Sequence, residues 1–416
     1  MNSNPLTPRW SGVLFLGLLV LVTAGSGSEP DRAKIEAEAM GQAAEADRLF
    51  KAGDFGAALP LYQAEQTSRA ALADVRYEAY AARAIGCCHE RLGNLEAAIA
   101  AWNTARRLDA KREDRGFEGY DWVLIGQAQL QLDRLQDGIA SLSRSLPLLS
   151  QAIDRDHEAD AQRLLGYALT ERGEPDRAWP HLERSLELAR VLDDPQREAA
   201  ALALLGRIDL DRGQPGPAAE WLSEARELYL SLGEEAQAAD LDRSLGDALT
   251  ALDRPDVALA HVESASETHQ RLEDLEALAD DLRFLAALQL EQGHLPAARD
   301  CARRAADASH AAEDPSGEIE SLVVLARIQS LEGAWKEAAT TLDRALAIVR
   351  PQGEPAEQVR LLILTAEVDR RADRTEPSQE RLNEAQRIAN QADNAALKRL
   401  VSEAKQQARR PVGRPE

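Results

Sequence analysis

Small and apolar positions recur along this chain with a period of 40 residues. One small residue occupies nine positions in a single register, and a second small residue follows each of them 12 positions later. The first set is Ala46, Gly86, Gly126, Gly166, Gly206, Gly246, Ala286, Ala326 and Ala366. The second set is Ala58, Ala98, Gly138, Ala178, Ala218, Ala258, Ala298, Ala338 and Ser378. Because both sets keep one register without an insertion, the pattern predicts tandem repeats, and the small side chains allow close approach between helices.

Large apolar residues flank these small positions and predict two amphipathic helices in each repeat. The residue before the first small position is apolar in the inner repeats: Ile85, Ile125, Leu165, Leu205, Leu245, Leu285 and Leu325. The residue four positions after the second small position is apolar throughout: Tyr62, Trp102, Leu142, Leu182, Leu222, Val262, Ala302, Leu342 and Leu382. This spacing gives each helix one apolar stripe. No stretch alternates Val, Ile and Thr, so we predict no sheet.

A turn is predicted between the two helices, seven residues after the first small position. Only Gly or Asp occurs there: Gly53, Gly93, Asp133, Gly173, Gly213, Asp253, Gly293, Gly333 and Asp373. Gly adopts the left-handed conformation that ends many helices without a steric penalty, and Asp tolerates it better than most residues. Pro175, Pro215 and Pro255 follow two residues later and suit the first turn of a helix. Asp194-Pro195 and Asp314-Pro315 mark connections between repeats.

The stretch LGYALTERGEPDRAWPHLERSL, residues 165–186, resembles a tetratricopeptide repeat. It has Leu-Gly, then Gly at the turn, then Ala, then Leu, and Trp122 stands where that motif often has Trp. The resemblance covers about residues 36–391. The unit here has 40 residues rather than 34, and is similar to the longer-helix repeats of signalling modulators and bacterial regulatory ATPases.

The resemblance implies an all-α, right-handed α-α superhelix, a solenoid of about nine helix-turn-helix repeats with a C-terminal capping helix. We assign residues 33–391 to the solenoid, 392–409 to the capping helix and 410–416 to a disordered tail.

Residues 1–26 have the layout of a secretory signal peptide. Arg9 precedes an apolar run from Val13 to Val22, and small residues follow it. Cleavage after Ala24 or Ser26 predicts an exported protein, periplasmic or extracellular. The alternative is an uncleaved membrane anchor formed by residues 10–24, which also places the repeats outside the cytoplasm.

Composition disfavours several classes of function. The formal net charge of −22 repels phosphate backbones, so we expect no nucleic-acid partner. The three cysteines, Cys87, Cys88 and Cys301, have no spacing typical of a disulfide framework or a zinc site. No nucleophile motif or phosphate loop occurs in the sequence. We therefore predict no enzyme activity, no cofactor, no metal and no small-molecule substrate.

Two groups of residues suggest metal ligands but fit them poorly. Asp154, Asp156, Glu158 and Asp160 imitate the start of a calcium loop. The sixth position of that loop is Ala159 rather than Gly, and the twelfth is Leu165 rather than Glu, so we interpret the carboxylates as a solvated helix face. His181, His261 and Cys301 share one position in three repeats, and we interpret them as surface positions of the second helix.

In proteins that this chain resembles, the first helix of each repeat lines a concave face, and we predict the binding residues there. Counted from the first small residue, the candidates stand at positions −6, −3 and +1. They are Arg83, Arg163, Arg243 and Arg283, then Arg207 and Arg327, together with Tyr80, Tyr120 and Tyr167.

Two interpretations of these arginines stay open. Asp160, Asp240 and Asp280 each precede an Arg by three residues, a spacing that pairs opposite charges along one helix. Alternatively, the arginines form a groove for an acidic or extended peptide, because guanidinium groups hold carboxylates well.

The sequence therefore predicts an exported, non-catalytic scaffold that holds a protein or peptide partner on its concave face. The alternative is a membrane-anchored accessory factor for assembly of an envelope complex or for secretion, if the N-terminal segment is retained.

Overall fold

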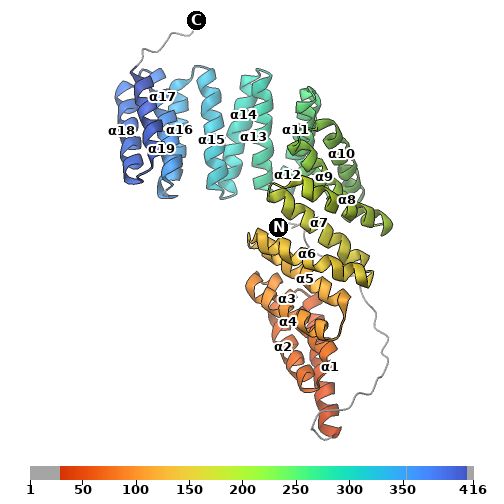
Figure 1. Cartoon of the computed structure of the whole chain (residues 1–416). Coiled ribbons are helices and arrows are strands. Elements are labelled where there is room, and N and C mark those ends of the chain that lie inside the picture. The colour runs from red at the N-terminus through yellow and green to blue at the C-terminus, as the bar shows by residue number, and fades with distance from the viewer. Residues whose placement is uncertain (1–28, 353, 410–416) are drawn as a thin grey trace. The chain divides into compact units, whose positions relative to one another are not determined.

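The computed structural model describes residues 29–352 and 354–409, and these residues form helices joined by turns of two or three residues (Figure 1). The contacts divide the chain into an N-terminal unit that ends at Ile208 and a C-terminal unit that begins at Asp209. The predicted signal segment, residues 1–26, and the predicted tail, residues 410–416, lie outside the described residues.

Nine helices begin in the described part of the N-terminal unit. They are α1 (Glu29–Lys51), α2 (Phe55–Ala71), α3 (Val75–Arg91), α4 (Leu95–Lys111), α5 (Arg115–Gln131), α6 (Leu135–Ala152), α7 (Arg155–Glu171), α8 (Pro175–Val191) and α9 (Pro195–Asp211), the last of which crosses the boundary.

Ten helices follow in the described part of the C-terminal unit. They are α10 (Pro215–Ser231), α11 (Glu235–Ala251), α12 (Pro255–Leu272), α13 (Leu275–Glu291), α14 (Leu295–Ala311), α15 (Pro315–Leu331), α16 (Trp335–Gln352), α17 (Pro355–Arg371), α18 (Thr375–Gln391) and α19 (Ala395–Ala408). The described residues are thus tandem helical hairpins followed by one last helix, with no strand among them, and the predicted fold class is confirmed.

The turn inside each hairpin has the predicted left-handed conformation. Its φ is +81° at Gly53 and +56° at Asp133, and each of the nine predicted Gly or Asp positions has a positive φ. The turns between hairpins use the same conformation at residues that the sequence reasoning did not identify, including Ala73, Glu113 and Ile153. The backbone therefore repeats every 20 residues, although the side-chain pattern repeats every 40.

A carboxylate caps the first helix of most hairpins. Asp314 accepts a hydrogen bond from the backbone N–H of Gly317 at 2.9 Å, and Asp194 accepts one from that of Arg197 at 3.0 Å. Asp74, Asp114, Asp154 and Asp274 make the equivalent bond. Because an unpaired N–H at a helix start is costly, a cap of this kind contributes about 1 kcal/mol to stability.

The predicted small residue meets the large residue that stands 16 positions after it. A Cβ atom added at Gly86 would lie 2.3 Å from Trp102 Nε1. The same addition at Gly166 would lie 2.5 Å from Leu182 Cγ. Both large side chains are fully buried, so the two helices of a hairpin come together only because one of them lacks a side chain at the contact.

The three cysteines are free thiols. Burial raises the pKa of Cys87 to about 12 and that of Cys88 to about 11, so both stay protonated at neutral pH. The two residues therefore act as core side chains. Among the described helices, none combines the length and the apolar composition that a membrane span requires.

Candidate functional site

The predicted binding residues lie on the odd-numbered helices, which are the first helices of the hairpins. We call the side chains at positions −9, −6, −3 and +1 from the small residue of these helices the first-helix face. These positions follow one another at helical spacing, so their side chains share one side of each helix.

Arg83 does not lie exposed on this face, contrary to the sequence prediction. Only 6% of the residue is exposed. Its Nε and Nη2 donate to the two oxygens of Asp121 at 2.6 and 3.0 Å, and Nη2 also donates to Asp109 at 2.5 Å. The guanidinium fork therefore closes on carboxylates of the following helices and is not available to a partner.

This buried cluster is tightly balanced in charge. Burial raises the pKa of Asp121, while the guanidinium of Arg83 opposes that shift. Burial likewise raises the pKa of Asp109, against the attraction of Arg83. The two carboxylates depend on Arg83 for compensation, since Asp109 and Asp121 are almost completely excluded from water.

The three predicted tyrosines also contact groups of the chain itself. The hydroxyl of Tyr80 donates to Asp47 at 3.2 Å. The ring of Tyr120 lies 4.1 Å from the ring of His157. The guanidinium of Arg207 lies 5.8 Å from the ring of Tyr167. These contacts position the tyrosines and leave part of each ring accessible.

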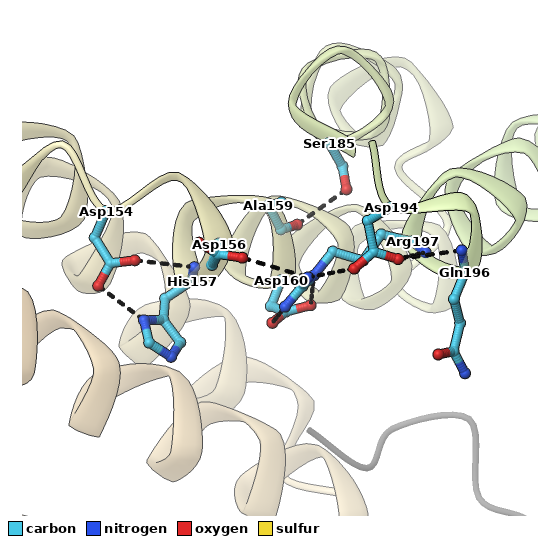
Figure 2. A network of polar contacts seen from close by, with 9 residues as sticks. All are labelled: Asp154, Asp156, His157, Ala159, Asp160, Ser185, Asp194, Gln196 and Arg197. Atoms are coloured by element: carbon cyan, nitrogen blue, oxygen red, sulfur yellow. Dashed lines mark hydrogen bonds and ion pairs between the residues drawn. The ribbon is translucent and has the colours of Figure 1, made fainter. Parts of the chain in front are cut away.

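The carboxylates that imitated a calcium loop bind cationic and backbone groups (Figure 2). Arg197 donates to both oxygens of Asp160 at 3.1 and 3.0 Å and to Asp194 at 2.6 Å. Asp154 caps α7 and contacts the ring of His157 at 2.8 Å. Asp160 is thus paired across neighbouring first helices, from α7 to α9, and not only along its own helix.

A second charge ladder follows the first-helix face of α11, α13 and α15 in the C-terminal unit. Arg243 pairs with Asp280 at 3.0 Å, and Asp280 also binds Arg283. Arg283 reaches Glu320 at 3.7 Å. The prediction of pairing along one helix holds for Asp280 and Arg283, and the remaining pairs join consecutive first helices.

Two of the predicted arginines have no such partner. Among the described residues, Arg163 and Arg327 make no hydrogen bond or ion pair. Arg163 is half-buried on α7, and Arg327 is exposed on α15. The guanidinium groups of these two residues are the predicted ones that remain free to hold an external carboxylate.

Two exposed aromatic rings were missed by the sequence reasoning. Tyr77 and Phe117 are 41% and 42% exposed, and both stand at position −9 of consecutive repeats. Arg69 lies 4.5 Å from the ring centre of Tyr77, and Arg83 lies 4.7 Å from that of Phe117. The recurrence of an aromatic residue after 40 positions was the available signal.

The histidines that share a repeat position serve separate contacts. His181 Nδ1 lies 2.7 Å from Gln162 Oε1, and His261 Nδ1 lies 2.6 Å from Asp242 Oδ1. Both rings are half-buried, as is Cys301. Their position is explained by packing of the second helix on the first.

Comparison with known proteins gives the same fold. Residues 159–231 match the family model of the tetratricopeptide repeat. A signal transduction ATPase with numerous domains and a tetratricopeptide repeat sensor, from Pyrococcus horikoshii, is similar in structure with a TM-score of 0.58 and 18% identity. The apo form of RapI is similar with a TM-score of 0.50 and 15% identity, over 70% of this chain and 98% of its own.

The similarity to the ATPase covers 77% of this chain and 47% of the other, so the chain spans about half the length of that protein. No curated protein sequence matches this chain. At these identities the comparisons establish the fold alone.

Replacement of Arg83 tests the buried cluster. We expect Arg83→Met to lower the free energy of unfolding by about 3–5 kcal/mol, because two buried carboxylates lose their counter-charge. Arg163→Met, at the same repeat position of α7, removes a guanidinium without an ion pair and should change stability by about 0.5 kcal/mol or less. Urea unfolding of the two variants measures the difference, and equal losses would contradict the assignment.

Proposed function

We propose that this chain, a protein of tetratricopeptide-like repeats, is a non-catalytic scaffold that docks a protein partner on its first-helix face. Repeats of this fold are typical of protein-interaction scaffolds, because stacked hairpins present one continuous row of helices. The proposal gives the partner two kinds of contact: aromatic anchors on α3 and α5, and guanidinium groups further along the chain.

The observation that carries the proposal is the exposure of Tyr77 and Phe117. Of the aromatic residues that the structure describes, these two are the exposed ones. Each ring has a guanidinium on one side, and that guanidinium is held in turn by carboxylates: Arg69 by Asp74 at 3.2 Å and Arg83 by Asp121. A ring that is fixed before binding loses little conformational entropy when a partner covers it, which is typical of interface hot spots.

The arginines contribute orientation in this proposal. Arg163 and Arg327 have no ion pair among the described residues, so an acidic group of the partner reaches them without breaking an existing contact. Arg207, Arg243 and Arg283 already pair with carboxylates of the chain, and a partner would have to exchange with those. Arg83 is buried and is no longer a candidate.

Export forms part of the proposal and rests on residues 1–26 alone. The mature chain then begins after Ala24 or Ser26, in the periplasm or outside the cell. The intact mass of the protein purified from its native envelope reads the N-terminus directly. A mass that retains residues 10–24 would favour the membrane-anchored accessory factor instead.

Site-specific photo-crosslinking in the native cell tests the docking surface. A photoreactive residue at position 77 or 117 should give a discrete adduct with one partner. The matched control is Val191, which is also apolar and exposed but lies at the end of the second helix α8, and should give none. Identical adducts from positions 77 and 191, or no adduct from either aromatic position, would contradict the proposal.

The same experiment separates anchors from guanidinium groups. With the crosslinker at position 120, Tyr77→Ala/Phe117→Ala should lower the adduct yield at least tenfold, since a hot spot contributes about 2 kcal/mol or more. Arg163→Ala/Arg243→Ala/Arg283→Ala should lower it several-fold, and more at low ionic strength. An unchanged yield in the arginine variant would remove the arginines from the site and leave the aromatic anchors.

A further inference from the structure

A recurring contact between hairpins is apolar in most repeats. It joins the residue 23 positions after the first small residue to the residue 5 positions before the next one. The pairs Leu149/Ala161, Ala189/Ala201 and Val349/Leu361 occupy these positions and are buried. A charged pair at this place therefore departs from the rule that the rest of the solenoid follows.

In the C-terminal unit, His269 and Asp281 hold these positions between α12 and α13. They are 1% and 0% exposed, respectively. His269 Nδ1 lies 2.6 Å from Asp281 Oδ2. The other ring nitrogen, Nε2, lies 3.6 Å from Asp240 Oδ1 on the first-helix face of α11. One imidazole ring thus joins three helices.

The surroundings of His269 carry an excess of negative charge. Asp240 on α11, Asp281 on α13 and Asp274 at the start of α13 all face the ring. Asp280 and Arg243 lie close to Asp281, but these two pair with each other at 3.0 Å. The second oxygen of Asp281 is buried without a hydrogen bond among the described residues. A buried carboxylate in that state depends on the charge of the imidazolium.

Only a protonated ring satisfies both neighbours. A neutral imidazole has one N–H, whereas the imidazolium donates from both nitrogens. Burial by itself lowers the pKa of His269, but the hydrogen bond to Asp281 and the charges of the three aspartates outweigh burial and raise it. Burial also raises the pKa of Asp281. Both shifts favour retention of a proton at a pH where the free groups would lose it.

We propose that the α12–α13 junction is a protonation-dependent lock, closed while His269 is an imidazolium between Asp281 and Asp240 and loosened when that proton is lost. The ring is solvated in the open state, where its pKa returns to the ordinary value near 6.5. The stabilisation is therefore complete below about pH 6.5 and disappears as the pH rises through the raised pKa of the closed state.

The lock reaches the first-helix face directly, because Asp240 on α11 and Asp280 on α13 both belong to it. Opening of the junction changes how these two helices present their side chains. The inference does not rest on the proposed function, since the closed and open junctions differ in hydrogen exchange whether or not a partner binds.

Hydrogen exchange of the full chain, corrected for the intrinsic rate at each pH, measures the lock. Peptides from α12 and α13 should be more protected at about pH 6 than at about pH 8.5, by tenfold for each unit by which the pKa of His269 is raised. Peptides from α15 and α16, in the same unit, should keep one protection factor. Equal protection of α12 and α13 at the two pH values would overturn the proposal.

A second measurement needs no substitution. The Cε1 proton of His269, followed by nuclear magnetic resonance, should titrate above pH 6.5. Titration at or below that value would mean that the ring is held neutral, and the lock would not exist.

Variants separate the charge from the packing. His269→Gln keeps a donor without a charge, and should give α12 and α13 a low protection that no longer changes with pH. His310→Gln is the matched control in the same unit, because His310 also contacts a carboxylate, Glu318 at 2.9 Å, but its side chain is 75% exposed. It should leave the pH profile as it is.

The double variant His269→Val/Asp281→Leu imitates the apolar pair Val349/Leu361. It should be protected at both pH values, because an apolar pair at this position needs no proton. Retention of the pH dependence in either His269 variant would assign it to another group and refute the lock.

Discussion

The close contact between a small residue and a large side chain 16 positions later is the constraint on which the rest of the structure depends. At Gly86 and Gly166 there is no room for a Cβ atom next to Trp102 and Leu182. Each hairpin closes around such a contact, and the backbone turns, which repeat every 20 residues, then place the next hairpin in the same way. Because the closure is local, the exposed side of the first helices is free to vary between repeats.

That freedom explains why charge chemistry differs along the solenoid. Within each unit the hairpins stack through mainly apolar contacts, and two positions replace these contacts by buried ions: Arg83 with Asp109 and Asp121, and His269 with Asp281. Buried ions stabilise less than apolar packing of equal volume, but removal of one partner is costly. They therefore make particular junctions sensitive to substitution or pH, while neighbouring junctions are not.

The sequence predicted the fold well because its signals are local and repeated. Small residues, Gly or Asp at the turn and Pro at helix starts all act within one hairpin, and the structure confirms each of them. The site was harder to predict. Arg83 and Arg163 share one repeat position, yet Arg83 is buried and Arg163 is half-buried, because only Arg83 has Asp109 and Asp121 on the next two helices. Such partners lie 26 and 38 residues away, beyond any pattern within one helix.

A double-mutant cycle on Gly86 and Trp102 tests the central constraint most directly. Gly86→Ala should lower the free energy of unfolding by about 1–3 kcal/mol, because the added methyl group overlaps the buried indole. With Trp102→Leu present, which imitates the pair Ala326 and Leu342, the same change should be neutral or stabilising by up to about 1 kcal/mol. Gly41→Ala, where no atom lies within 4 Å of the added group, should stabilise in either case. An equal effect of Gly86→Ala with and without Trp102 would contradict the account.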